Sequence, residues 1–328
     1  MSAPAVGIVG AGSIGLAMAV VFAGAGSRVR IHEPSSEMAA SVPSRLDERL
    51  RLLLEAGLLA ESPADVAARV SVGAGLAAAI GDVDLVFECT PEDLEIKRAV
   101  FRDIAATAPR HAILASTSSA FGAGEFAGEL AGRDRCLVLH PANPPYLIRV
   151  VEVVPAPFTG EDVVSRATEL LRAANLIPVV LGAEVTGFVY NRLQGAVLRE
   201  AYCLVRDGVI DVEGLDTIVR EGLGLRWAVV GPFETADLNT RGGIAAHAVR
   251  LGPAYERMGA ERGQHDPWTP ELVAEVTAQR RAILPLDEWE DRTMWRDRRL
   301  AGLRHHLDQQ NERRLCRAPA ESTGKELA

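Results

Sequence analysis

The chain has 328 residues, which is enough for two domains of ordinary size. Hydrophobic residues make up 48% of it and charged residues 24%, a balance typical of a soluble globular protein rather than a disordered one. The formal net charge of −9 predicts an acidic surface that repels phosphate backbones, so we expect no nucleic acid partner.

The cysteines and the apolar runs limit the class of protein further. None of the four cysteines forms a Cys-x-x-Cys pair, so neither a metal site nor a disulfide framework is predicted, and we expect a reducing, cytoplasmic location. No run of about 18 uninterrupted apolar residues occurs, so no membrane span is expected. Glycines interrupt the apolar start of the chain, which favours a strand, a turn and a helix over a signal peptide.

Strand and helix signals alternate up to about residue 180. The predicted strands cover residues 6–9, 29–31, 83–87, 112–115, 136–139 and 150–154, and the predicted helices include 36–59, 92–106 and 161–174. This alternation implies a parallel sheet with helices on both faces. The long stretch 36–59 is predicted to be a helical arm inserted after the second strand.

Strand signals stop at about residue 185. Helical periodicity continues through residues 188–206, 212–221, 232–250, 270–283 and 286–314. The predicted fold class is therefore α/β, a Rossmann-type doubly wound sheet over residues 1–184 followed by an all-helical C-terminal domain over 185–317. Residues 318–328 are expected to form a disordered tail.

A glycine-rich turn follows the first predicted strand and opens a helix. Its sequence, G-A-G-S-I-G over residues 10–15, matches the dinucleotide-binding fingerprint, although an ordinary glycine-containing turn is the alternative. Glu33 ends the second strand, where a carboxylate accepts hydrogen bonds from the adenosine ribose and repels a 2′-phosphate. The pattern predicts NAD as the cofactor. The residues expected to bind it here are Gly10, Gly12, Ser13, Ile14, Gly15 and Glu33.

A histidine and a glutamate lie on consecutive predicted strands. His140 ends one strand, at the edge of the sheet where open α/β folds bind ligands, and Glu152 lies on the next. Oxidation of a secondary alcohol needs a base for the hydroxyl proton while the cofactor takes the hydride, and a carboxylate can orient that base. The pair favours a dehydrogenase over a purely structural histidine.

Polar residues also follow other predicted strands. Glu92 and Lys97 come just after the strand 83–87, where they either reach the nicotinamide half of the cofactor or simply begin a helix. The hydroxyl cluster 116–119 either binds a substrate oxygen or caps a helix. Asn191, at the start of the helical domain, either donates to a carbonyl oxygen or is a surface residue.

Together these motifs resemble the 3-hydroxyacyl-CoA dehydrogenase family over nearly the whole chain, and most closely its lambda-crystallin / L-gulonate 3-dehydrogenase branch. The resemblance rests on five segments: P-E-D-L-E at 91–95, H-P-A-N-P-P at 140–145, F-V-Y-N-R-L-Q at 188–194, E-G-L-G-L-R-W at 221–227 and W-R-D at 295–297. Members of this family are usually dimers through the helical domain, so the resemblance implies a homodimer.

The resemblance also implies roles for single residues. His140 matches the catalytic base and Glu152 its carboxylate partner. Ser118 matches the serine that contacts substrate and nicotinamide, and Asn191 the asparagine that holds the substrate oxygen. The remaining matches are cofactor contacts, namely Glu92, Lys97 and Asn143.

The arm after the second strand departs from the acyl-CoA members, in which lysines meet the CoA phosphates. Residues 47–55 contain no lysine and several acids. Arg226, in the segment G-L-R-W, instead resembles the sequence of the branch that acts on small free hydroxy acids. Arginine can clamp a carboxylate with two parallel hydrogen bonds, although helix-end arginines also bond helix carbonyls.

The predicted function is NAD-dependent oxidation of the 3-hydroxyl of a small hydroxy acid, L-gulonate-like or a related 3-hydroxycarboxylate, to the 3-keto acid. The alternatives are a 3-hydroxyacyl-CoA dehydrogenase and a non-catalytic, crystallin-like NAD-binding protein.

Overall fold

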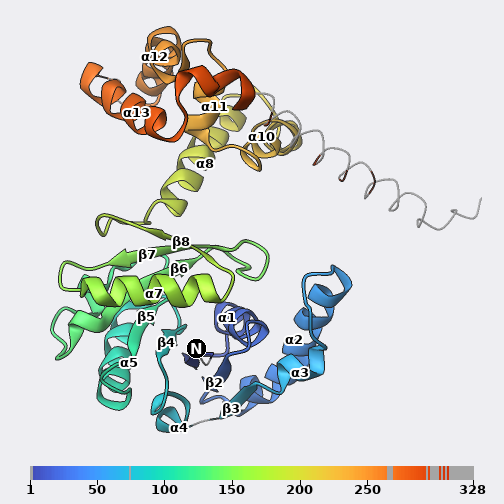
Figure 1. Cartoon of the computed structure of the whole chain (residues 1–328), viewed down its shortest axis with the longest axis vertical. Helices are drawn as coiled ribbons and strands as arrows, with labels where there is room; N and C mark the ends of the chain where they lie inside the picture. The colour runs from blue at the N-terminus through green and yellow to red at the C-terminus, as the bar shows by residue number, and fades with distance from the viewer. Residues whose placement is uncertain are drawn as a thin grey trace, which may run out of the picture. The chain divides into compact units, whose positions relative to one another are not determined.

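The computed structural model describes residues 3–73, 75–263 and 269–292, together with residues 295, 303, 306 and 309. Contacts within the chain divide it into two compact units, Met1–Glu200 and Ala201–Ala328 (Figure 1). The tail predicted over 318–328 and most of the helix predicted over 286–314 lie outside the described residues. The predicted domain boundary between residues 184 and 185 stays a prediction.

An eight-stranded sheet in the order β3-β2-β1-β4-β5-β6-β7-β8 forms the centre of the first unit (Figure 1). All neighbouring strands are parallel except β6 and β7. The strands are β1 (Ala5–Val9), β2 (Arg28–His32), β3 (Val70–Gly73), β4 (Leu85–Glu88), β5 (Ile113–Ser116), β6 (Cys136–Pro141), β7 (Val150–Pro155) and β8 (Ile177–Val180). The Rossmann-type sheet followed by helices confirms the predicted fold class.

The two strands that the sequence did not predict, β3 and β8, are the edges of the sheet. Central strands such as β4 are buried on both faces and form continuous apolar runs. In contrast, β3 alternates between half-buried and exposed residues, and β8 is mostly exposed and contains Pro178. Neither edge strand therefore carries the apolar signal of a buried strand.

The prediction of a wholly parallel sheet is wrong at β6 and β7, which pair antiparallel. Residues 142–149 alone join these strands, whereas a parallel pair needs a crossover of roughly a dozen residues or more. The antiparallel register sets His140 directly opposite Glu152. Facing residues of such a pair lie on the same side of the sheet, so this reversal brings the two side chains together.

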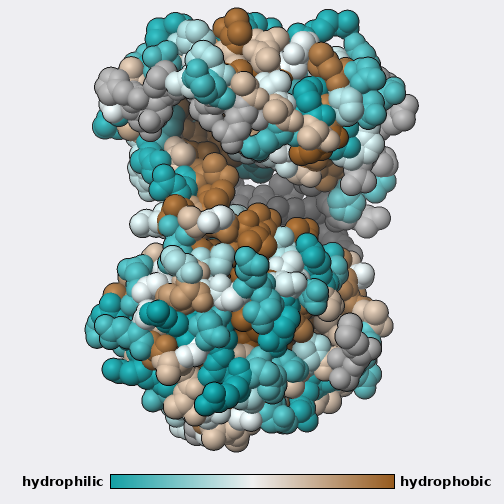
Figure 2. All heavy atoms as spheres, turned by 60° about the vertical axis from the view of Figure 1, so that its left-hand side comes forward, coloured by the Kyte–Doolittle hydropathy of each residue, from teal (hydrophilic) through white to brown (hydrophobic). Residues whose placement is uncertain are grey.

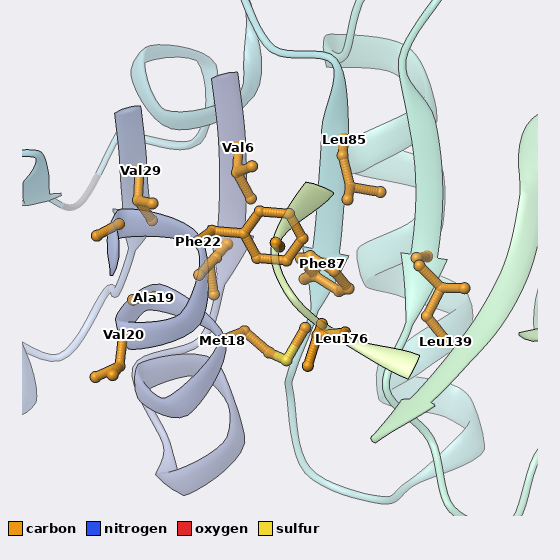
Figure 3. Close-up of a cluster of buried hydrophobic side chains, with 14 of the residues drawn as sticks. Val6, Met18, Ala19, Val20, Phe22, Val29, Leu85, Phe87, Leu139 and Leu176 are labelled. Carbon is orange, nitrogen blue, oxygen red and sulfur yellow. The ribbon is translucent and has the colours of Figure 1, made fainter. Parts of the chain in front are cut away.

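The helices of the first unit cover both faces of the sheet. Helix α1 is almost wholly apolar, and its Phe22 lies against Phe87 of β4 with ring centroids 5.4 Å apart (Figure 3). The predicted arm is α2, which buries Val42, Leu46, Leu50 and Leu53 against the same core. The helices are α1 (Ser13–Gly24), α2 (Ser36–Glu55), α3 (Pro63–Ala67), α4 (Leu76–Ile80), α5 (Leu94–Thr107), α6 (Ala123–Ala127), the 3₁₀ turn η1 (Arg133–Arg135) and α7 (Glu161–Ala173).

The described part of the second unit is helical. It begins within α8 and contains no helix that is both long and apolar enough to cross a membrane. The elements are α8 (Tyr190–Arg206), α9 (Val212–Ile218), the π-helical turn η2 (Val219–Gly224), α10 (Leu225–Trp227), α11 (Pro232–Leu238), α12 (Gly243–Glu261), α13 (Pro270–Ile283) and the 3₁₀ turn η3 (Leu286–Glu288).

The single helix predicted over 232–250 is wrong, because α11 and α12 are separate helices. Gly242 and Gly243, where α12 begins, have φ values of 97° and 72°. These values lie outside the right-handed helical region, so one continuous helix cannot run from α11 into α12. The fully buried Asp237 accepts a hydrogen bond from the Ile244 amide at 2.8 Å, and so caps the first turn of α12. Apolar periodicity continues across this break and therefore does not reveal it.

Two glycines of the fingerprint make a matched pair of variants. A Cβ on Gly15 would lie 2.0 Å from the Gly10 carbonyl oxygen, so we expect Gly15→Ala to lower the free energy of unfolding by about 1–3 kcal/mol or more. A Cβ on Gly12 meets no heavy atom within 4 Å, so Gly12→Ala should keep the melting temperature but weaken NADH binding. Thermal unfolding and NADH fluorescence titration measure both. Equal loss of stability in the two variants would contradict this account of the turn.

Candidate active site

A buried histidine–carboxylate pair lies at the end of β6. His140 Nδ1 is 2.7 Å from Glu152 Oε2, and the two residues are only 6% and 4% exposed. Because an ionised carboxylate can only accept, Nδ1 carries the proton in this hydrogen bond. The other ring nitrogen, Nε2, is then the acceptor in the neutral imidazole, as a general base requires.

The second oxygen of Glu152 holds the start of α8. Oε1 accepts hydrogen bonds from the amides of Val189 and Tyr190, at 2.8 and 2.9 Å. The chain reaches this position through a left-handed turn, in which Gly187 has φ 75° and Phe188 has φ 49°. The Phe188 ring is buried with its centroid 5.4 Å from that of His140. One carboxylate therefore orients the imidazole and caps a helix.

A second buried carboxylate, Glu88, ends β4 and was not singled out from the sequence. It accepts hydrogen bonds from Ser116 Oγ at 2.6 Å, from the Thr90 amide at 2.7 Å and from Lys97 Nζ at 3.2 and 3.1 Å. Glu88 is 0% exposed and Lys97 is 1% exposed. A glutamate closing a fully apolar strand was the available signal, since a buried charge needs a partner.

Glu92 connects this ion pair to Ser118. Its Oε1 accepts from Ser118 Oγ at 2.5 Å and from the amides of Ser119 and Ala120, and its Oε2 lies 3.4 Å from Lys97 Nζ. Burial opposes ionisation of Glu92, but the hydrogen bond from Ser118 and the charge of Lys97 outweigh it, so the pKa of Glu92 lies below its ordinary value.

The hydroxyl of Ser118 is fully used in this arrangement. Its one proton goes to Glu92, and its oxygen accepts from the Phe121 amide at 2.8 Å. Asn191 lies close by, because its Nδ2 donates to the Ser119 carbonyl at 3.1 Å and leaves a second amide hydrogen for another acceptor. Of the two, Asn191 is the side chain with a donor to spare for a substrate oxygen.

Apart from the residues of the glycine-rich turn and Glu33, two predicted site residues stand outside this cluster. Asn143 follows His140 on an exposed loop, and among the described residues its side chain makes no hydrogen bond to the cluster. Arg226 belongs to α10 of the second unit, where it lines a cavity of about 580 Å³. The other polar or aromatic side chains that line this cavity include Trp227, Phe233, Asn239, Arg250 and Tyr255.

The glycine-rich turn fits a dinucleotide. Gly10 has φ 104°, and a Cβ there would lie 2.8 Å from the Cys89 carbonyl oxygen. No side chain caps the first turn of α1, and the space around the Gly12 Cβ position is open. Uncapped amides at this helix N-terminus suit a pyrophosphate. Glu33, 8% exposed, accepts from the amides of Ala11 and Ser35 at 2.9 Å each, so each oxygen keeps a lone pair for a ribose hydroxyl.

Comparison with known families decides the identity. The model of the 3-hydroxyacyl-CoA dehydrogenase NAD-binding domain matches residues 5–185, and that of the C-terminal domain of the same enzymes matches 187–283. The chain belongs to the 3-hydroxyacyl-CoA dehydrogenase family. It is an NAD-dependent oxidoreductase, and the predicted family, enzyme class and cofactor are confirmed.

Several proteins are similar to this chain over most of their own length. The lambda-crystallin homolog of Bos taurus is 37% identical over 94% of this chain and 98% of its own. The L-carnitine dehydrogenase of Streptomyces coelicolor is 33% identical over 83% of each chain. A solved 5-formyl-3-hydroxy-2-methylpyridine 4-carboxylic acid 5-dehydrogenase, named as an NAD+ dependent dismutase, has a TM-score of 0.70 and 27% identity over 93% of this chain and 98% of its own.

The Glu88–Lys97 pair carries a stability prediction. Lys97→Met leaves the Glu88 charge buried and uncompensated, so we expect the free energy of unfolding to fall by about 3–5 kcal/mol. The double variant Glu88→Gln/Lys97→Met removes both charges and should recover most of that loss. Arg98→Ala is the control, because Arg98 pairs with Glu95 at the surface. Denaturant unfolding measures all three, and a Lys97→Met variant as stable as the control would refute the prediction.

Proposed function

We propose that this enzyme oxidises the 3-hydroxyl of a small free 3-hydroxycarboxylate with NAD, giving the 3-keto acid. L-gulonate-like acids and related 3-hydroxycarboxylates are the candidate substrates. The observation that best supports oxidation of an alcohol is the His140–Glu152 pair, whose Nδ1 and Oε2 atoms are 2.7 Å apart, in the same unit as the dinucleotide turn. The names of two relatives, an L-carnitine dehydrogenase and a pyridine carboxylic acid dehydrogenase, support a free acid.

The arm α2 adds support for a free acid over a CoA ester. It contains no lysine, and its arginines are engaged within the protein. Arg45 and Arg49 donate to backbone carbonyls, and Arg51 pairs with Asp47 at 2.6 Å. The arm therefore has no lysine to offer the CoA phosphates, and Arg49 and Arg51 would have to leave their present partners to bind one.

In the proposed mechanism, His140 Nε2 removes the substrate hydroxyl proton. Bound NAD supplies the hydride acceptor. Glu152 stabilises the imidazolium that forms, and its hold on α8 keeps the ring oriented. The second amide hydrogen of Asn191 is available to the substrate oxygen, whereas Ser118 must first release Glu92 before it can donate.

Removal of the base tests this mechanism. We expect His140→Ala to lower kcat by roughly a hundred- to ten-thousandfold, because general-base catalysis contributes about that much. Its affinity for NADH, measured by fluorescence titration, should be unchanged. His111→Ala is the matched control, since His111 is an exposed histidine that pairs with Asp84. Near-wild-type turnover by His140→Ala with NADH bound would eliminate His140 as the base.

A substrate panel tests the proposed function itself. NADH formation would be followed with free 3-hydroxy acids, among them L-gulonate and carnitine, and with 3-hydroxyacyl-CoA esters. Faster turnover of 3-hydroxybutyryl-CoA than of any free acid would favour the acyl-CoA alternative, which the family models support. NADH binding without turnover of any member of the panel would favour the non-catalytic, crystallin-like alternative.

Arg226 is proposed to bind the substrate carboxylate. A hydrogen bond to a charged group contributes about 1.5–3 kcal/mol, so Arg226→Ala should raise KM for the acid by roughly 10- to 150-fold. KM for the corresponding neutral lactone or ester should change much less, and NADH affinity not at all. The control is Arg241→Ala, which removes an exposed arginine from the same unit. Equal losses on acid and ester would make Arg226 a structural residue.

Glu33 is proposed to set the cofactor preference. Its carboxylate would accept from the ribose hydroxyls and repel a 2′-phosphate. The wild type should therefore bind NADH more tightly than NADPH and give a higher kcat/KM with NAD than with NADP. Equal use of both cofactors would contradict this role.

A homodimer and a cytoplasmic location remain predictions. Large apolar side chains are exposed on the helical unit, including Tyr202, Val249 and Ile283 at 75%, 81% and 74%, and brown apolar patches lie among its polar residues in the upper part of Figure 2. Such residues suit burial in a dimer interface. Sedimentation of the purified protein measures the oligomeric state.

A further inference from the structure

Arg45 of α2 is the cation that reaches the cofactor turn. Its Nη1 donates a hydrogen bond to the Ala11 carbonyl at 3.1 Å and lies 3.4 Å from Ser41 Oγ. Ala11 is the residue between Gly10 and Gly12, at the centre of the fingerprint. No sequence motif marks Arg45, since it lies in the middle of α2 and only the packing of α2 against the turn brings it there.

Arg45 and Glu33 hold the same residue from its two ends. Glu33 Oε2 accepts from the Ala11 amide at 2.9 Å, while Arg45 donates to the Ala11 carbonyl. The amide nitrogen and carbonyl oxygen of one residue are only a few bonds apart. A carboxylate and a guanidinium therefore both contact Ala11, at the end of the site where the fingerprint places the adenosine ribose.

The guanidinium has donors to spare. Within the part of the chain that the structure describes, Nη1 makes all the hydrogen bonds of this side chain, so Nε and Nη2 are free to meet a ligand. What distinguishes Arg45 is its contact with the turn, since Arg49 donates to the Arg45 carbonyl and Arg51 pairs with Asp47 instead. A planar guanidinium with two free nitrogens matches the geometry of a phosphate.

We propose that Arg45 is a latent site for the 2′-phosphate of NADP, and that Glu33 alone reserves the enzyme for NAD. This inference rests on the proposed role of Glu33. While Glu33 is present, its charge repels the phosphate before Arg45 can bind it. Once Glu33 is replaced by a small neutral residue, Arg45 binds the phosphate. A single substitution therefore removes the repulsion and leaves the Arg45 guanidinium available to the 2′-phosphate.

The test compares Glu33→Ser with Glu33→Ser/Arg45→Ala and Glu33→Ser/Arg45→Gln. NADH and NADPH affinities are measured by nicotinamide fluorescence, and those of ADP-ribose and 2′-phospho-ADP-ribose by calorimetry, so no substrate is needed. We expect Glu33→Ser to gain NADPH affinity and either Arg45 substitution to remove roughly tenfold or more of it. NADH affinity should fall much less. Glu33→Ser/Arg51→Ala, which removes one exposed cation from the same helix, should keep the NADPH affinity of Glu33→Ser.

Separate results overturn the two roles. A wild type that binds NADPH as tightly as NADH would refute the role of Glu33, while the loss on substituting Arg45 would still decide whether Arg45 binds the phosphate. Equal losses of NADH and NADPH on substituting Arg45 would show that it only holds the turn. An unchanged NADPH affinity, or an equal loss in the Arg51 control, would show that Arg45 does not bind the phosphate specifically. Arg45→Gln keeps an amide donor for Ala11 if Arg45→Ala does not fold, and melting temperatures report on that.

Discussion

The arrangement of the site depends on the hydrogen bonds that the Glu152 carboxylate accepts. One of its oxygens orients His140 and the other accepts the first amides of α8. A helix N-terminus favours negative charge, and so would the imidazolium that His140 forms in the proposed mechanism. The helix thus keeps the carboxylate in position, and the carboxylate ties the first residues of α8 to His140. The same side chain therefore fixes both the orientation of His140 and the first turn of α8.

Two buried carboxylates serve the site differently because their partners differ. Glu88 faces an ammonium group, two hydroxyls and a backbone amide, which together neutralise and saturate it. It has no capacity left for a ligand, and its effect is to hold the ends of β4 and β5 together. Glu152 instead faces a titratable ring and two amides. Its charge is therefore available to a proton that arrives at His140. Burial alone does not distinguish the two carboxylates, whereas their partners do.

Much of this arrangement is readable from sequence, and its limits have physical causes. The fingerprint glycines and the buried strands follow from local pattern, because each feature is set by neighbours in the chain. The facing of His140 and Glu152 depends on the short connection 142–149, whose length was visible although its consequence, an antiparallel pair, was not drawn. The burial of Lys97 and the approach of Arg45 to Ala11 depend on how separate elements pack. No local period encodes such contacts, whereas the break between α11 and α12 had a local signal, the adjacent Gly242 and Gly243, which the apolar periodicity obscured.

The exposed edge strand β8 has a consequence for solubility. The amides of Ile177 and Leu181 donate to carbonyls on the β7 side, at Arg149 and Val153. Since N–H groups alternate in direction along a strand, residue 178 faces away from β7, towards the open edge. That residue is a proline, which has no N–H to offer. A foreign strand that approached this apolar edge would find no donor at residue 178, which makes β8 a poorer template for intermolecular strand pairing.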